Sequence, residues 1–141
     1  IRTSQYTILL AAAPGEPHML GASLLADQFS DAGWRVDMAF PGSSEALANQ
    51  LGDQHPDVVD ISLSEALPRH GRLAALRETV KQCREANPEE PLVVSVGGRL
   101  FAEAIATAEH VGADHARQTT AGTRIKMANL VRSSRAPTRI S

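Results

Sequence analysis

Short apolar runs alternate with amphipathic stretches along the chain. Uninterrupted apolar runs are typical of parallel strands that are buried on both faces. They predict four strands, at Tyr6–Ala12, Trp34–Phe40, Val58–Leu63 and Pro91–Val96, and a weak fifth that begins at Gly112-Ala113-Asp114. The helical period of the intervening stretches predicts helices over His18–Ala32, Ser43–Gln54, Pro68 to about Ala86, Leu100–Val111 and Ala121–Val131.

Five strands that alternate with five helices predict an α/β fold of the flavodoxin-like type. This is a doubly wound, five-stranded parallel sheet with strand order 2-1-3-4-5. Ligands of such sheets bind outside the carboxyl ends of the strands, near the switch point between strands 1 and 3. His18 follows the first strand, Ser62 and Ser64 end the third, and Gly97-Gly98 follow the fourth. We therefore expect these residues to line one crevice.

Composition limits the class of protein. The chain has 141 residues, of which 43% are hydrophobic and 21% charged, as in one globular domain. The longest apolar run, Ile8–Pro14, is much shorter than the roughly 20 residues of a membrane span. A single cysteine, Cys83, excludes an internal disulfide and favours a cytoplasmic setting. We expect Cys83 on an exposed helical face, as an incidental thiol. The alternative is a reactive thiol whose pKa Lys81 and Arg84 lower. The start at Ile1, without a methionine, indicates a piece of a longer protein.

Charge divides the chain unevenly. Residues 1–116 carry a net charge of −8, whereas residues 117–141 hold six basic residues and no acidic one. We expect a domain over 1–131 and a basic tail or linker over 132–141. The acidic body argues against direct DNA binding, because it repels the phosphate backbone.

Missing motifs exclude several functions of flavodoxin-like proteins. The first strand ends in Ala11-Ala12-Ala13, without the acidic pair with which a phosphoacceptor receiver holds magnesium. A hydroxyl-rich phosphate loop, a Walker lysine and GxGxxG are also missing after that strand. We find no activated nucleophile, paired carboxylate or metal-ligand cluster, so we expect no enzyme.

The loop after the first strand reads Glu16-Pro17-His18-Met19-Leu20-Gly21. It resembles the D-x-H-x-x-G signature of cobalamin-binding domains, with Glu in place of Asp. The resemblance implies that His18 is the axial metal ligand and that Glu16 binds the other ring nitrogen, which would strengthen the imidazole as a ligand. Gly21 would allow close approach of the ligand.

Two further segments carry the same resemblance. Ser62 matches the serine of the S-x-L element, which in the family contacts the displaced nucleotide base, whereas Ser64 stands where leucine is expected. Gly97-Gly98 match the paired glycines that let the nucleotide tail pass close to the backbone. The resemblance covers residues 6 to 131.

A narrower resemblance concerns the sensory domains of bacterial light and redox regulators. It rests on Gly15-Glu16-x-His18-x-Leu20-Gly21 and on Ala32-Gly33-Trp34. That group includes antirepressors of photosynthesis genes, and its SCHIC-type branch is named a sensor containing heme instead of cobalamin. The resemblance implies a regulatory sensor that binds one tetrapyrrole, cobalamin or heme. Its partner would be a transcription regulator or another domain of the same full-length protein.

Two other functions stay open, as do simpler roles for the residues. The chain is alternatively a corrinoid carrier module of a methyltransferase, or a fold kept only for protein interaction. His18 would then cap a helix, Glu16 would be a first-turn acid, Ser62 would satisfy backbone groups, and Gly97-Gly98 would form a turn. No role is expected for His55, His70, His110 and His115.

Overall fold

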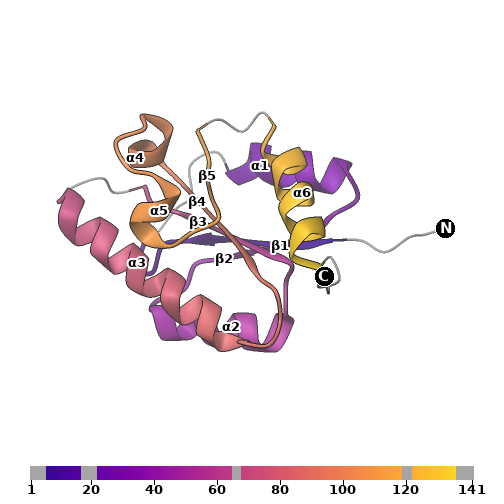
Figure 1. The fold of residues 1–141 in the computed structure, drawn as a ribbon, viewed down its shortest axis with the longest axis horizontal. Helices are drawn as coiled ribbons and strands as arrows, with labels where there is room; N and C mark the ends of the chain where they lie inside the picture. The colour runs from indigo at the N-terminus through magenta and orange to yellow at the C-terminus, as the bar shows by residue number, and fades with distance from the viewer. Residues whose placement is uncertain (1–5, 17–21, 65–67, 119–121, 136–141) are drawn as a thin grey trace, which may run out of the picture.

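Five parallel strands form the centre of the fold (Figure 1). The computed structural model describes residues 6–16, 22–64, 68–118 and 122–135. The strands pair in the order β2-β1-β3-β4-β5, which confirms the predicted sheet. Their bounds are β1 Thr7–Ala12, β2 Arg35–Ala39, β3 Val58–Ser62, β4 Val93–Gly97 and β5 His115–Ala116.

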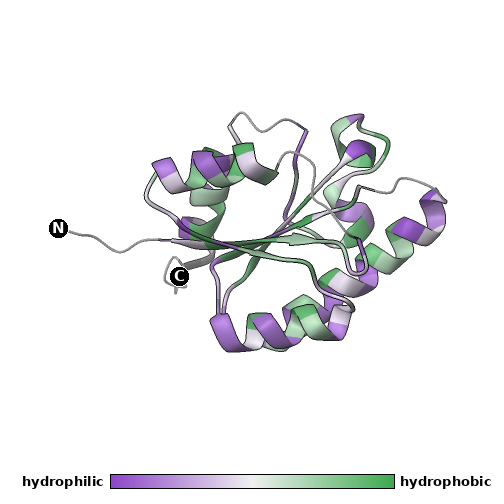
Figure 2. Ribbon diagram, turned by 180° about the vertical axis from the view of Figure 1, so that it is seen from behind, coloured by the Kyte–Doolittle hydropathy of each residue, from purple (hydrophilic) through white to green (hydrophobic). Residues whose placement is uncertain are grey.

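Helices cover both faces of this sheet, with α1 and α6 on one side and α2 and α3 on the other (Figure 1). They are α1 Ala22–Asp31, α2 Ser44–Gln54, α3 Arg69–Ala86, α4 Arg99–Ala102, α5 Ala108–Val111 and α6 Thr123–Arg135. Their apolar sides lie toward the strands and their polar sides face outward, as Figure 2 shows. None of the helices within the described ranges is long and apolar enough to cross a bilayer.

Alternation along the strands divides the core into two clusters. Val59 and Ile61 of β3 pack with α2, α3, α4 and α5, whereas Val58 of the same strand packs with α1 and α6. On the α1 side, Trp34 meets the ring of Phe29 edge-on, with centroids 4.8 Å apart. Successive residues of β3 and β4 therefore face opposite helix layers, which fixes the side on which each polar residue of the site lies.

The predicted helix over Leu100–Val111 is interrupted. Helix α4 ends at Ala102, Ala104 adopts a left-handed backbone with φ 58°, and α5 starts only after Thr107. Thr107 and His110 cap α5 reciprocally through side chain and backbone. The left-handed residue Ala104 and the new helix start at Thr107 thus override the helical period. Helix α6 runs to Arg135, so the predicted tail over 132–141 begins inside this helix.

Cys83 is buried, contrary to the prediction of an exposed thiol. It lies on the inner side of α3 and is 1% exposed. Burial raises its pKa to about 12, and the charge of Arg84 offsets only part of that effect. The alternative in which neighbouring cations lower this pKa is therefore wrong, because removing the thiolate from water outweighs the attraction of Arg84.

Candidate functional site

Backbone hydrogen bonds bring four loops together at the carboxyl edge of the sheet. The amide of Ala13 donates to the carbonyl of Ser62 at 2.8 Å, and that of Leu63 donates to Gly97 at 2.9 Å. The amide of Arg117 donates to the carbonyl of Val96 at 2.7 Å. The segments that follow β1, β3, β4 and β5 consequently lie side by side at this edge, as the fold class predicts.

Glu16 connects the loop after β1 to the loop after β3. Its side chain is 5% exposed, and its Oε1 accepts hydrogen bonds from the amide of Ser64 at 2.7 Å and from the Ser64 hydroxyl at 2.5 Å. The amide of Glu16 in turn donates to the carbonyl of Ala13 at 3.0 Å, which closes a tight turn. Hydrogen bonds to a carboxylate are stronger than neutral ones, so Glu16 holds the two loops in register.

The structure thus brings Glu16 and Ser64 together, and this hydrogen-bonded pair was not predicted from the sequence. Ser64 stands where the family signature has leucine, and its hydroxyl is a partner that leucine would lack. His18 and Gly21 lie outside the described residues. The predicted contact between Glu16 and the ring of His18 stays a prediction.

Ser62 belongs to a second polar cluster, which lies on the face covered by α1 and α6. The guanidinium of Arg117 donates to both carboxylate oxygens of Asp60, at 2.7 and 2.9 Å, and to the Ser62 hydroxyl at 2.9 Å. The side chains of Arg117 and Asp60 are 11% and 2% exposed. Ser95, next to Asp60 in the β3–β4 register, is fully buried, and its hydroxyl makes no hydrogen bond to any described residue.

The polar cluster of Asp60, Ser95 and Arg117 was not predicted from the sequence. A partial signal was present, because Asp60 and Ser62, and also Ser95, interrupt otherwise apolar strands at positions that point to one face. Their partner Arg117 is 57 residues away along the chain from Asp60 and follows a strand of only two residues. Only the three-dimensional structure identifies it.

The predicted glycine pair is explained by contacts within the chain. A Cβ atom on Gly98 would lie 2.0 Å from the carbonyl oxygen of Leu63, and Gly98 has φ 125°. A Cβ atom on Gly97 would lie 2.2 Å from Nη2 of Arg117. Gly98 therefore needs glycine for close packing of the chain itself, whatever ligand the domain takes, whereas a side chain at Gly97 would have to displace the guanidinium of Arg117.

His115 lies beside this polar cluster, in register with Ser95. Burial lowers its pKa, and the positive charges of Lys126 and Arg117 lower it further, while Asp60 acts in the opposite direction. The ring is thus kept neutral more readily than a histidine in water.

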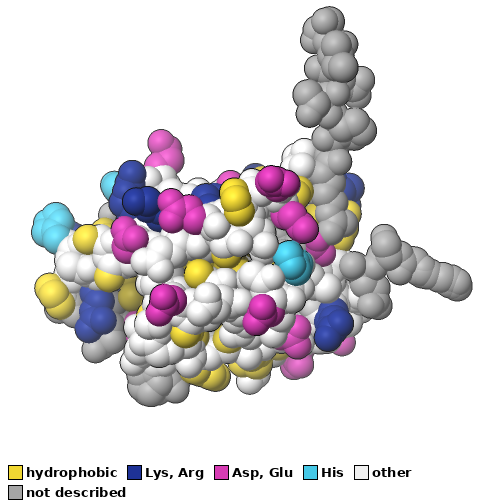
Figure 3. All heavy atoms as spheres, turned by 90° about the horizontal axis from the view of Figure 1, so that it is seen from below, with side chains coloured by type: hydrophobic (Ala, Val, Ile, Leu, Met, Phe, Trp, Pro, Cys, Tyr) yellow, Lys and Arg dark blue, Asp and Glu magenta, His cyan; other side chains and the backbone are white. Residues whose placement is uncertain are grey.

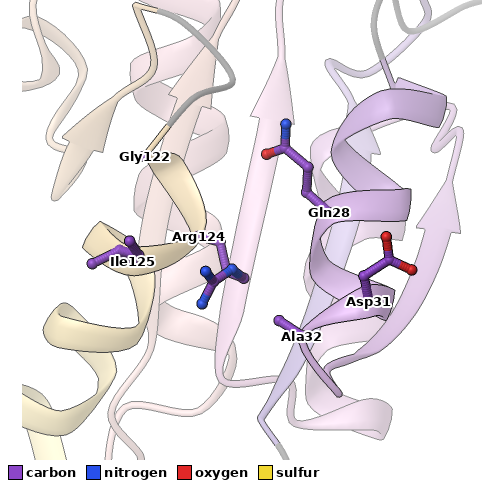
Figure 4. A pocket seen from close by; sticks show the side chains of 6 residues that line it. All are labelled: Gln28, Asp31, Ala32, Gly122, Arg124 and Ile125. Carbon is purple, nitrogen blue, oxygen red and sulfur yellow. The ribbon is translucent and has the colours of Figure 1, made fainter.

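The described cavities near the site are small or open. One cavity, about 100 Å³ in volume, borders Glu16 and Leu63 between the loop after β1 and α3. A larger groove of about 410 Å³ runs between α1 and α6 (Figure 4), lined by Gln28, Asp31, Ala32, Gly122, Arg124 and Ile125. It includes none of the predicted site residues. Among the described residues, no group of three or more His, Cys, Asp or Glu is placed to hold a metal ion.

Comparison with known protein families finds a match over most of the chain. The profile of the B12 binding domain matches residues 6–125, which include every described residue of the site. The chain belongs to the B12-binding domain family. This confirms the broad resemblance, while the narrower resemblance to heme-binding sensory domains stays a prediction.

Solved structures support the fold of this B12-binding domain. A cobalamin-binding protein from Desulfitobacterium hafniense DCB-2 superposes with a TM-score of 0.74 at 21% identity, over 89% of this chain and 59% of that chain. This chain thus spans less than two thirds of that protein. The receiver domain of the Francisella response regulator 1452 superposes with a TM-score of 0.60 at 15% identity, over 93% of this chain and all of the receiver. No curated protein matches the sequence.

Proposed function

We propose that this domain is a regulatory sensor that binds one tetrapyrrole, cobalamin or heme, and signals to a protein partner. The partner is a transcription regulator or another domain of the same protein, in the cytoplasm, as in photosynthesis-gene antirepressors. Membership of the B12-binding family supports the ligand class. The observation that carries the proposal is the Glu16–Ser64 link, because it places a buried carboxylate two residues before His18, at the edge where this fold binds ligands.

Residues on this edge fit a tetrapyrrole that lies outside the sheet. The cavity beside Glu16, at about 100 Å³, is far below the roughly 300 Å³ at which pockets for drug-sized ligands begin. The macrocycle would therefore cover the loops after β1 and β3. The metal of the tetrapyrrole would offer an axial position that a neutral imidazole can fill.

The chain's own groups would set how His18 meets that metal. Glu16 is already oriented by Ser64, so a ring nitrogen of His18 would find a carboxylate in a fixed position. A carboxylate behind a ligating histidine fixes its tautomer and raises its basicity. We propose binding and signalling as the role of this site, without a catalytic step.

Replacement of His18 tests the ligand assignment. We expect His18→Ala to abolish the imidazole-ligated absorption spectrum with aquocobinamide, which has no nucleotide base of its own, or the ligated Soret band with hemin, because the axial donor is gone. His55→Asn is the matched control, because His55 has a left-handed backbone that asparagine tolerates and lies far from the carboxyl edge. Spectra of His18→Ala that match those of the unmodified chain would contradict the assignment. A chain that binds neither tetrapyrrole would favour the fold kept only for protein interaction.

A further inference from the structure

The sheet face under α1 and α6 changes from apolar to polar toward the carboxyl edge. Val58 and Val93, at the start of β3 and β4, belong to the apolar cluster on this side. Two and four residues further along, the same face carries Asp60 and Ser62 on β3, and Ser95 and Gly97 on β4. A carboxylate buried in a sheet interior destabilises the fold unless a cation or donors compensate it.

Arg117 provides that compensation. It binds Asp60 through two nitrogens and Ser62 through one, and its own backbone amide is fixed to Val96. Burial alone would lower the pKa of Arg117, but the charge and hydrogen bonds of Asp60 outweigh it and raise this pKa. The guanidinium is therefore held as a charged group inside the domain.

The same guanidinium fills the space above Gly97. The distances of 2.2 and 2.3 Å from a Cβ on Gly97 to Nη2 and Cζ of Arg117 mean that the planar group lies against the glycine backbone. Ser95 lies on this face with a hydroxyl that no described residue satisfies. Without Arg117, the sheet would offer a polar recess formed by Asp60, Ser62, Ser95 and Gly97.

We propose that Arg117 determines which tetrapyrroles the site admits, by closing this recess to any ligand that carries a bulky tail. The inference rests on the proposed function and adds a specificity residue to it. A ring without a tail, such as heme or cobinamide, would need only the outer edge of the sheet. Cobalamin carries a nucleotide tail, and the family resemblance at Gly97-Gly98 implies that this tail would enter the space beside Gly97 that Arg117 fills.

Displacement of Arg117 by a nucleotide tail would cost free energy, because the buried groups that Arg117 binds would lose their partner. It would leave the carboxylate of Asp60, which is 2% exposed, without its cation, and Ser62 without its donor. A buried charge that loses its partner destabilises a protein far more than the intact pair stabilises it. A nucleotide base carries no positive charge at neutral pH to replace the guanidinium.

The test compares two corrinoids that differ only in the nucleotide tail. Absorption titrations would give the dissociation constants of hydroxocobalamin and of aquocobinamide for the unmodified chain and for Arg117→Ala. We expect the unmodified chain to favour cobinamide at least about tenfold, a difference of about 1.4 kcal/mol. In Arg117→Ala that preference should fall to near unity, through tighter binding of cobalamin and with little change for cobinamide.

A second variant covers the case in which the uncompensated Asp60 unfolds Arg117→Ala. Asp60→Ser combined with Arg117→Ser opens the same recess and leaves no buried charge. Arg84→Ala is the control for loss of an arginine ion pair away from the recess, because Arg84 pairs with Asp114 at 3.1 Å, more exposed to solvent, from α3 on the other face of the sheet. This control should keep the preference for cobinamide.

The outcomes separate this inference from the proposed function. The role of Arg117 is overturned if the unmodified chain binds cobalamin as tightly as cobinamide or more tightly. It is also overturned if the preference for cobinamide persists in both Arg117→Ala and the double variant. In either case the proposal that the domain binds a tetrapyrrole still stands. If hydroxocobalamin, aquocobinamide and hemin all fail to bind any of these proteins, the proposed function falls and the specificity role falls with it.

Discussion

His115 lies in an environment that favours the neutral ring. It lies half-buried on β5, and burial followed by the nearby charge of Lys126 lowers its pKa below the ordinary value of 6.5. At pH values near and below 6.5 the unfolded chain therefore binds more protons at this position than the folded chain. By linkage, this contribution destabilises the fold as the pH falls through 6.5 toward the lowered pKa, and it vanishes at higher pH.

Replacing His115 should remove this part of the acid sensitivity. We expect His115→Asn to lose less free energy of unfolding than the unmodified chain between about pH 7.5 and pH 5.5, because its side chain cannot titrate. Urea unfolding at a series of pH values measures the difference. His70→Asn, at an exposed position of α3, is the control. Parallel pH profiles for His115→Asn and the unmodified chain would contradict the prediction.

For single residues, the position of a site residue was easier to predict from the sequence than its hydrogen-bond partner. Glu16, Ser62 and Ser64 were all expected at the carboxyl edge, and the structure places them there. Their hydrogen bonds could not be predicted, because Ser64 and Arg117 are 48 and 55 residues away along the chain from Glu16 and Ser62. Such pairings depend on how loops from separate strands meet, which a local pattern does not encode.

Among the elements, the segment from α4 to α5 departs most from its sequence pattern. Ala104 takes the left-handed conformation that ends many helices, although an L-residue with a Cβ adopts it at a cost of about 1 kcal/mol. The amides of Ile105 and Ala106 both donate to the carbonyl of Leu100, at 2.9 and 3.0 Å, which makes the turn tight. The burial of Ala106 and the cap at Thr107 offset the free-energy cost of the left-handed backbone at Ala104.

Glycine at position 104 should therefore stabilise the domain. We expect Ala104→Gly to raise the free energy of unfolding by up to about 1 kcal/mol, since glycine adopts a positive φ without strain. Ala74→Gly, at an exposed position inside α3, should instead lower it by about 1 kcal/mol, the usual cost of glycine in a helix. Thermal or urea unfolding of both variants checks the opposite signs, and destabilisation by Ala104→Gly would contradict the argument.

Strands and long helices were predictable because each follows one repeated pattern. The β1 run is apolar on both faces, those of β3 and β4 are mostly apolar, and the expected α2 and α3 differ from the observed helices by at most one residue at each end. The predicted helix over Leu100–Val111 failed because apolar spacing continues through the left-handed Ala104, and the cap formed by Thr107 and His110 starts a second helix. Periodicity finds a helix face, but capping residues decide where each helix begins and ends.

For the whole molecule, charge argues for a protein rather than a DNA partner. Residues 1–116 carry a net charge of −8 and residues 117–141 carry +6, and on the one face that Figure 3 shows the basic and acidic side chains are interspersed. A nucleic-acid surface would need basic residues gathered over one face, where they release counterions from phosphates. This distribution supports our proposal that the output is a change in affinity for a protein partner.

Ligand binding can produce that output only if the ligand prefers one of two states of the domain. We expect the states to differ in the segments Ala12–Pro17 and Ser64–Gly71, of which the second runs into the first turn of α3, because Glu16 and Ser64 tie the two together at the ligand edge. Ordering of the first segment by the ligand would then order the second. A partner that contacts the second segment would respond without touching the ligand.

Hydrogen–deuterium exchange with and without hydroxocobalamin or hemin measures this coupling. We expect the ligand to slow exchange in both segments of the unmodified chain. In Glu16→Ala the two hydrogen bonds to Ser64 are lost, so any protection that remains in Ala12–Pro17 should no longer extend to Ser64–Gly71. Glu45→Ala, which removes an exposed acid from the first turn of α2, should keep the coupling. If the second segment of Glu16→Ala is still protected to the same degree, the signal reaches it by another route, and the Glu16–Ser64 link is a static brace instead of a switch.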